Sequence, residues 1–231
     1  MAEAYLNPTK DQTFEIIAGG DSAYNFITIL KQAREWQESG DIAKACNARF
    51  RAIQDLQELL PEDDEVWLEW NHPNSQAAIE LVNLSAVDHF LIGDYEIATA
   101  LLELSLELDG EDHLESSNLL AYCYLAMDEF ELFDEVINDI SDKSASRVVL
   151  LLWSAFLREG SMPEGEVRNF KNRFAAYHAE FVADHHPVDA DYLTDVEAAR
   201  PSQSTQAREL WLRTESLWEA CPQFIEALRE A

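Results

Sequence analysis

Residues 79–112, IELVNLSAVDHFLIGDYEIATALLELSLELDGED, contain two helical patterns separated by a short polar turn. Apolar and small side chains recur at helical spacing in both halves. In the first half they are Leu81, Val82, Leu84, Ser85, Phe90 and Leu91, and in the second Ala98, Leu101, Leu102, Ser105 and Leu108. An isolated helix pair cannot bury both of its apolar faces, so this stretch predicts an array in which similar pairs stack on either side.

The polar turn recurs along the chain. The turns at Gly93, Met127-Asp128 and Gly160 are spaced by about 34 residues, and helical patterns lie on both sides of each. An earlier turn at Gly40-Asp41 lies further from Gly93 than this period allows. The excess length indicates an insertion, which we assign to residues 61–75.

The quoted stretch resembles a tetratricopeptide repeat in pattern and in length. The positions that carry the resemblance are Val82, Ser85, Ala86 and His89 on the first helix, Ala98, Leu102 and Ser105 on the second, and Gly110 at the close. Ala86 and Ala98 agree best with the family pattern. The resemblance implies an all-α, right-handed α-α superhelix of about four helix pairs, with capping helices at both ends.

We therefore expect residues 1–231 to form a single helical-repeat domain. Its predicted parts are an N-terminal cap with a divergent first helix pair (1–60), an insertion (61–75), two repeats (76–112 and 113–143), a pair with an extended second helix (144–186), and C-terminal capping helices (187–231). Three local expectations follow. Residues between Asn7-Pro8 and Gly19-Gly20 should form a short capping helix, Pro163 to Asp184 should form one helix of about six turns, and the last helix should bend at Pro222.

The resemblance also implies a concave groove lined by the first helix of each pair. The candidate partner-binding residues of this groove are Asn83, Val87, Asn118, Ala121, Arg147 and Arg158. Asn118 and Arg147 suit a clamp for a terminal carboxylate, whereas Asn83 and Val87 stand where such a clamp needs Lys and Asn. A groove that is apolar in its middle and basic at one end is typical of binding to a peptide with apolar anchors.

The insertion contains two tryptophans, Trp67 and Trp70, three residues apart. A helical turn there would place both rings on one face. Either Val66, Trp67 and Trp70 cover the apolar end of a helix pair, or the two rings contact a ligand, as loop residues often do. In the helix predicted before the insertion, from Ile42 to Leu60, helical spacing places Phe50 on the inward face.

The charge of the chain is strongly negative, with 45 acidic against 16 basic residues and a formal net charge of −29. Such a charge repels nucleic acid and anionic membranes, and it agrees with a solvated surface or a basic partner. Three scattered cysteines, Cys46, Cys123 and Cys221, indicate reduced thiols. Without a signal peptide or a long apolar span, we expect a cytoplasmic protein.

His178, His185 and His186, with neighbouring aspartates, are candidate metal ligands at a helix end. They lack the spacing of a known metal motif, and no nucleophile or phosphate-loop motif occurs. We expect no cofactor and no catalysis. The first hypothesis is an adaptor that binds a protein or peptide. The alternatives are a protein that self-associates when its C-terminal amphipathic helix fills a groove in the same or a second chain, and a metal-dependent enzyme at the histidine cluster.

Overall fold

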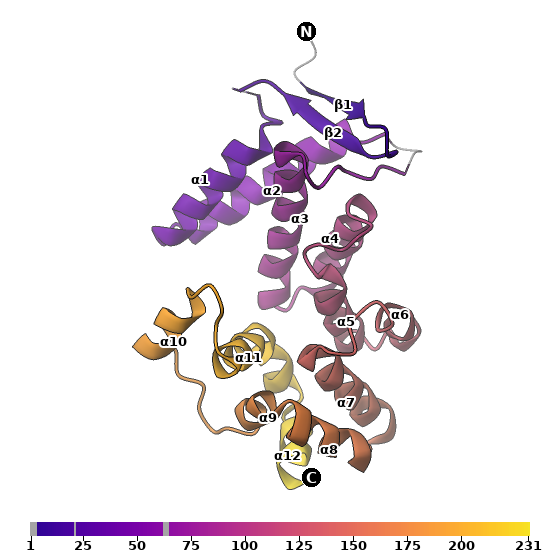
Figure 1. The fold of residues 1–231 in the computed structure, drawn as a ribbon, viewed down its shortest axis with the longest axis vertical. Coiled ribbons are helices and arrows are strands. Elements are labelled where there is room, and N and C mark those ends of the chain that lie inside the picture. Colours follow the sequence, from indigo (N-terminus) through magenta and orange to yellow (C-terminus); the bar gives the residue numbers. More distant parts are fainter. Residues whose placement is uncertain (1–3, 21, 62–64) are drawn as a thin grey trace. The chain divides into compact units, whose positions relative to one another are not determined.

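The computed structural model describes residues 4–20, 22–61 and 65–231, and helices make up most of it. The all-α expectation is therefore confirmed at the level of fold class, with one small sheet in addition. The chain divides into two compact units, residues 1–123 and 124–231, which we call the N-terminal and C-terminal units. Figure 1 shows the helices and strands of both units.

In the described residues of the N-terminal unit, four helices and a β-hairpin are present, and a fifth helix begins there. The helices are α1 (Phe26–Glu38), α2 (Ile42–Leu59), α3 (Pro73–Leu91), α4 (Tyr95–Leu108) and α5 (Ser116–Ala126). The side chain of Asn25 accepts a hydrogen bond from the Thr28 N–H and caps α1, and Pro73 occupies the first turn of α3, where its missing N–H costs nothing. Helices α1 and α2 pack on each other and on α3, which packs on α4.

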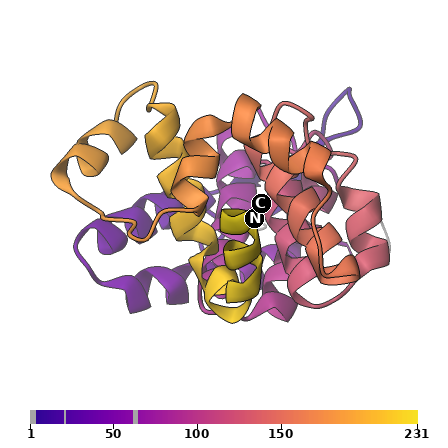
Figure 2. The same cartoon turned by 90° about the horizontal axis from the view of Figure 1, so that it is seen from below.

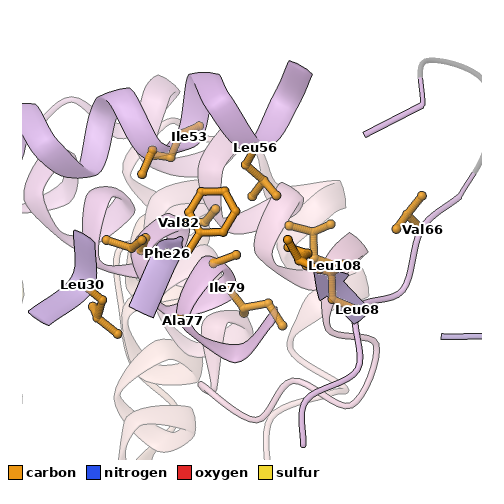
Figure 3. Packing of buried hydrophobic residues seen from close by; sticks show 14 residues of the cluster. Phe26, Leu30, Ile53, Leu56, Val66, Leu68, Ala77, Ile79, Val82 and Leu108 are labelled. Atoms are coloured by element: carbon orange, nitrogen blue, oxygen red, sulfur yellow. The ribbon is translucent and has the colours of Figure 1, made fainter. Parts of the chain in front are cut away.

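The core of this unit lies between these helices and the hairpin. Phe26 is fully buried at its centre, among side chains from α2 and α3 such as Ile53 and Val82 (Figure 3). Arg49 is also buried, with 2% of its surface exposed. Its guanidinium binds both carboxylate oxygens of Asp88, at 2.7 and 2.9 Å, and so connects α2 to α3. A charge buried this deeply is tolerated only because it is paired.

The prediction that Phe50 faces inward is wrong. Phe50 is 54% exposed, while the inward face of α2 is formed by Ala45, Arg49, Ala52, Ile53 and Leu56. Adjacent helical residues point about 100° apart. Because Arg49 turns inward to reach Asp88, Phe50 is directed outward.

The expected N-terminal capping helix is also wrong. Strands β1 (Ala4–Pro8) and β2 (Phe14–Ala18) form an antiparallel hairpin, with Ala4 opposite Ala18. Polar side chains at the start of α3 bind the hairpin. The backbone N–H of Ile16 donates to Ser75 Oγ at 3.0 Å, and Asn74 Nδ2 donates to the Ile16 carbonyl at 3.1 Å. These contacts come from residues far along the chain, so local patterns did not reveal them.

The C-terminal unit holds the end of α5 and seven further helices. They are α6 (Phe130–Val136), α7 (Ala145–Glu159), α8 (Glu164–Arg173), α9 (Ala175–Phe181), α10 (Ala190–Val196), α11 (Gln203–Ala220) and α12 (Pro222–Glu230). The single helix predicted from Pro163 to Asp184 is wrong, because the chain breaks at Phe174 between α8 and α9. The break brings the buried rings of Phe170 and Phe181 to 6.1 Å from each other. The predicted bend at Pro222 is confirmed.

The turns predicted between helices are confirmed as turns. Gly40, Gly93 and Gly160 have φ of 84°, 78° and 69°, and Asp128 has φ of 60°. Each lies between two consecutive helices. Left-handed backbone at these places is natural for glycine and, among other residues, best tolerated by Asp and Asn.

Helices α9, α11 and α12 lie close together in the C-terminal unit (Figures 1 and 2). Helix α11 packs on α9, with the rings of Trp211 and Phe181 at 5.2 Å. From α12, Phe224 reaches the ring of Phe156 on α7, at 5.8 Å. The amphipathic helix predicted to fill a groove thus packs in the same chain, and self-association through it stays a prediction.

Candidate functional site

Within the inserted segment, residues 65–69 are extended and are held by backbone hydrogen bonds on both sides, while residues 62–64 lie outside the described part of the chain. The N–H of Phe14 donates to the Trp67 carbonyl at 2.7 Å, and the N–H of Glu69 donates to the Phe14 carbonyl at 2.8 Å. On the other side, the N–H of Leu68 donates to the carbonyl of Leu108, the last residue of α4, at 2.8 Å. A helical turn that would place both tryptophan rings on one face does not form through Trp67, because the backbone of residues 67–69 is hydrogen-bonded to Phe14 and Leu108 instead.

An extended backbone directs successive side chains to opposite faces. Val66 and Leu68 belong to the buried core, and Leu68 lies beside Leu108 (Figure 3). Trp67 points the other way and is 52% exposed. Glu65 and Glu69 stand two residues before and two residues after Trp67, so the alternation places them on the same face.

The indole of Trp67 lies beside the loop between α4 and α5. A Cβ placed on Gly110 would lie 3.8 Å from Trp67 Cε2, so the ring lies beside Gly110 at a distance that a methyl group there would fill. The next residues are held firmly. Asp112 has φ of 51°, and its carboxylate accepts hydrogen bonds from the N–H groups of Ser116 (2.6 Å) and Ser117 (3.2 Å). These bonds satisfy free donors at the start of α5 and stabilise the strained loop.

Trp70 has a different environment from Trp67. Its ring stacks on His113 with centroids at 4.4 Å and planes within 3°. The imidazole is oriented by Asp109, whose carboxylate lies 2.8 Å from His113 Nδ1 and accepts the His113 backbone N–H at 2.7 Å. The environments of the two tryptophans therefore differ: Trp70 is stacked on His113 of the loop, whereas Trp67 is half-exposed beside Gly110.

Three carboxylates belong to the segments that carry or adjoin Trp67: Glu65 and Glu69 on the extended segment and Glu111 next to Gly110. The pKa of Glu69 is lowered, first by the hydrogen bond from the Thr13 hydroxyl and then by those from the backbone and side chain of Asn71. Glu111, beside Gly110, is 85% exposed. Among the ion pairs of the residues described, none joins a Lys or Arg to Glu65, Glu69 or Glu111. We call the surface formed by Glu65, Trp67, Glu69, Gly110 and Glu111 the Trp67 face.

Four of the six predicted groove residues lie in the N-terminal unit. Asn83 Nδ2 donates to Ser116 Oγ at 2.9 Å, and Val87 is half-buried. Asn118 is half-buried, and its Oδ1 has no hydrogen-bond partner among the described residues. Ala121 is fully buried. Their role in binding stays a prediction.

The other two groove residues, Arg147 and Arg158, lie in the C-terminal unit, where both bind α6 or the residues that follow it. Arg147 donates to the carbonyls of Ile137 and, at 2.7 Å, Ile140. Arg158 pairs with Asp134 at 2.7 Å and lies over the Phe130 ring, 4.8 Å from its centroid. Both guanidinium groups are therefore engaged within the unit, and a role in partner binding stays a prediction for them too.

The three candidate metal ligands have separate environments. His178 is half-buried, and its pKa is lowered by burial and by the charge of Lys171. His185 is exposed, and His186 contacts Glu180, with Nδ1 2.6 Å from Oε1. In the described part of the chain, no group of three or more His, Cys, Asp or Glu side chains is arranged to hold a metal ion.

Sequence reasoning singled out Trp67 but missed the rest of the Trp67 face. The available signal was the alternation in Glu65-Val66-Trp67-Leu68-Glu69, which has the period of a strand. Gly110 and Glu111 gave no signal, because only the fold brings them beside Trp67.

In comparisons with known proteins, no family model, no curated protein and no solved structure matches the chain. In the described residues, no helix combines the length and apolar character needed to cross a bilayer. Function therefore has to be inferred from the site itself.

Proposed function

We propose that this chain is a non-catalytic adaptor that binds a partner protein at the Trp67 face, through a basic segment of that partner. The observation that carries the proposal is a half-exposed tryptophan on a segment fixed by backbone hydrogen bonds on both sides. Tryptophan is enriched among the residues that dominate binding energy at protein interfaces. Because this segment is already rigid, less conformational entropy is lost when a partner covers the ring.

Charge complementarity supports a basic partner. Glu65 and Glu69 flank Trp67 on the extended segment, Glu111 adjoins Gly110, and the hydrogen bonds that lower the pKa of Glu69 favour its charged form. An arginine of the partner could stack on the indole and pair with a carboxylate at its edge. Cation–π contacts of this kind contribute about 0.5–1 kcal/mol at exposed sites. The net charge of −29 would also speed the approach of a basic protein.

The polar groups next to Trp67 support a binding role rather than catalysis. His113, the one imidazole of the loop from Asp109 to Glu115, is stacked on Trp70 and bound by Asp109. Asp112 is occupied in capping α5. These groups fix the shape of the surface.

The proposal extends to architecture and compartment. Consecutive helices joined by left-handed turns at Gly40, Gly93, Asp128 and Gly160 support a tetratricopeptide-like superhelix, a scaffold suited to binding. Cys46, Cys123 and Cys221 are free thiols, and burial raises the pKa of Cys123 to about 12. Free thiols support a reducing, cytoplasmic location.

The proposal is tested by affinity capture from lysate of the source cells with three forms of the full chain. These are the native chain, Trp67→Ala, and Phe50→Ala as a matched control, since Phe50 has nearly the same exposure in the same unit. A partner retained by the native chain and by Phe50→Ala, but lost by Trp67→Ala, is the expected result. Circular dichroism confirms that all three are equally helical.

Equal retention of the same partners by all three forms would contradict the proposal. A partner lost by an Asn118→Ala variant but kept by Trp67→Ala would instead favour the groove that the tetratricopeptide resemblance implies. Because the substitutions at Trp67 and Phe50 leave the net charge unchanged, nonspecific attraction to basic proteins cannot produce the expected difference.

A further inference from the structure

A pocket of about 260 Å³ lies in the C-terminal unit, at the junction of α11 and α12. Its lining follows helical spacing on both helices: Trp211, Glu215, Trp218 and Glu219 on α11, then Pro222, Ile225, Glu226 and Arg229 on α12. Residues three, four and seven apart share one face of a helix. The chain break at Cys221 turns these two faces toward each other, and residues 183–186 add a third wall.

The floor of the pocket is apolar and firmly packed. Trp211 and Trp218 are 7% and 3% exposed, and Ile225 is buried beside them. One side of Trp211 stacks on His186 at 3.9 Å, and Phe181 meets both indoles edge-on, at 5.2 and 5.6 Å. The ring faces are thus largely occupied by other rings, so the floor offers a ligand apolar surface more than open π-faces.

The wall that carries His186 is held by a buried carboxylate. Glu180 Oε1 lies 2.6 Å from His186 Nδ1, and Arg208 binds the same carboxylate, with Nη2 donating to Oε2 at 2.9 Å. The charge of Glu180 is therefore compensated inside the unit. Its function is to position the wall, and it is not available to a ligand.

The rim, by contrast, carries more negative than positive charge. Asp184, Glu215, Glu219 and Glu226 line it together with a single guanidinium, that of Arg229. Arg229 donates to the carbonyls of Val182 and Ala183, at 3.1 and 2.7 Å, and pairs with Asp184 at 3.4 Å. Across the described residues, the three glutamates of the rim form no ion pair.

We propose that this pocket binds an alkylammonium group, with the hydrocarbon chain on the tryptophan floor and the ammonium at the glutamate rim. An apolar floor below several carboxylates selects a cation with an apolar body and repels anions. A volume below the roughly 300 Å³ at which pockets for drug-sized ligands begin suits a linear amine or one side chain. Because the indole faces are covered, the carboxylates recognise the cation, which favours primary and secondary ammonium over methylated ammonium.

Two sources supply this chemistry: a free polyamine and a lysine side chain of a protein. Both are tested by calorimetric titration of the full chain, with spermidine in one arm and a short peptide containing a single lysine in the other. The test variant is Glu215→Gln with Glu219→Gln. The matched control is Glu131→Gln with Glu135→Gln, an exposed pair on α6 with the same spacing and charge change, outside the pocket.

Saturable one-to-one binding to the native chain and the α6 control, at least tenfold weaker in the α11 variant, is the expected result. Tighter binding of spermidine identifies a free polyamine as the ligand, and tighter binding of the peptide identifies a lysine side chain. Absence of saturable binding in both arms, or equal affinity of the α11 variant, overturns the proposal. This site is independent of the Trp67 face, so Trp67→Ala should bind spermidine as the native chain does.

Discussion

The two units present tryptophan in opposite ways. In the N-terminal unit, backbone hydrogen bonds with Phe14 and with the carbonyl of Leu108 fix an extended segment, and the alternation of that segment directs Trp67 into solvent. In the C-terminal unit, Trp211 and Trp218 lie seven residues apart on one face of α11 and are buried as the floor of a pocket. The same residue type thus offers a surface in one case and a cavity lining in the other, because the local backbone period differs.

The difference extends to what holds each site in place. Main-chain bonds hold the Trp67 face, so it depends little on any one charged side chain. The pocket depends on Glu180 of α9. Its carboxylate binds Arg208 on α11 and His186 in the loop between α9 and α10. The consequences of substitution should therefore differ between the two units.

The largest effect is expected for Glu180→Ala. The substitution leaves Arg208 and His186, both mostly buried, without their shared carboxylate. Removing one partner of a buried pair costs about 3–5 kcal/mol in the free energy of unfolding. Urea unfolding followed by tryptophan fluorescence measures this cost, and spermidine binding should weaken as well. A loss below about 1 kcal/mol would show that the pocket does not depend on this pair.

The next effect compares two neighbours in the extended segment. Leu68 is buried beside Leu108, so Leu68→Ala should cost about 2–4 kcal/mol of unfolding free energy. Trp67 is half-exposed, so Trp67→Ala should cost about 1 kcal/mol or less while it abolishes partner binding. Unfolding curves of both variants check the contrast. Equal costs would mean that the ring of Trp67 is part of the core.

A smaller effect concerns the pH dependence of the Trp67 face. Hydrogen bonds from Thr13 and Asn71 lower the pKa of Glu69 in the folded state, so the unfolded chain binds the proton more readily. The resulting stability is present above the ordinary pKa of a glutamate and is lost as the pH falls through the lowered folded value. Between about pH 5 and pH 3, the native chain should therefore lose more stability than Glu69→Gln.

The size of this pH effect should stay below about 1 kcal/mol, because Glu69 is partly exposed to solvent. Unfolding free energies measured across that pH range provide the test. Glu111→Gln removes the same charge from the same face and serves as the control. If both variants change the pH dependence equally, the hydrogen bonds to Glu69 have no specific role.

Much of the helical framework could be predicted, because its signals are local. The turns at Gly93, Asp128 and Gly160 and the bend at Pro222 follow from residues that favour a helix end wherever they occur. The stripe of Trp211 and Trp218 on α11 was visible as helical spacing. Its role as a pocket floor was not, because the pocket also needs the break at Cys221 and the wall at His186.

The wrong predictions have a nonlocal cause. The hairpin, the extended segment and the inward turn of Arg49 are each decided by a partner far along the chain. Ser75 binds Ile16, Leu108 binds Leu68, and Asp88 binds Arg49. Short apolar runs such as residues 14–18 fit either a helix or a strand by themselves, and tertiary contacts decide between them.

The smallest effect is expected for Gly110→Ala, which tests whether the contact between Gly110 and the Trp67 ring matters for stability and binding. A Cβ at Gly110 would meet Trp67 Cε2 at 3.8 Å, an ordinary van der Waals distance. Stability should change by no more than about 0.5 kcal/mol, and partner binding should persist. Gly93→Ala is the contrasting control, because Gly93 has φ of 78° and a side chain there costs about 1 kcal/mol or more. Loss of binding in Gly110→Ala with unchanged stability would mean that the partner contacts the backbone of Gly110 itself, and the Trp67 face would then extend onto this loop.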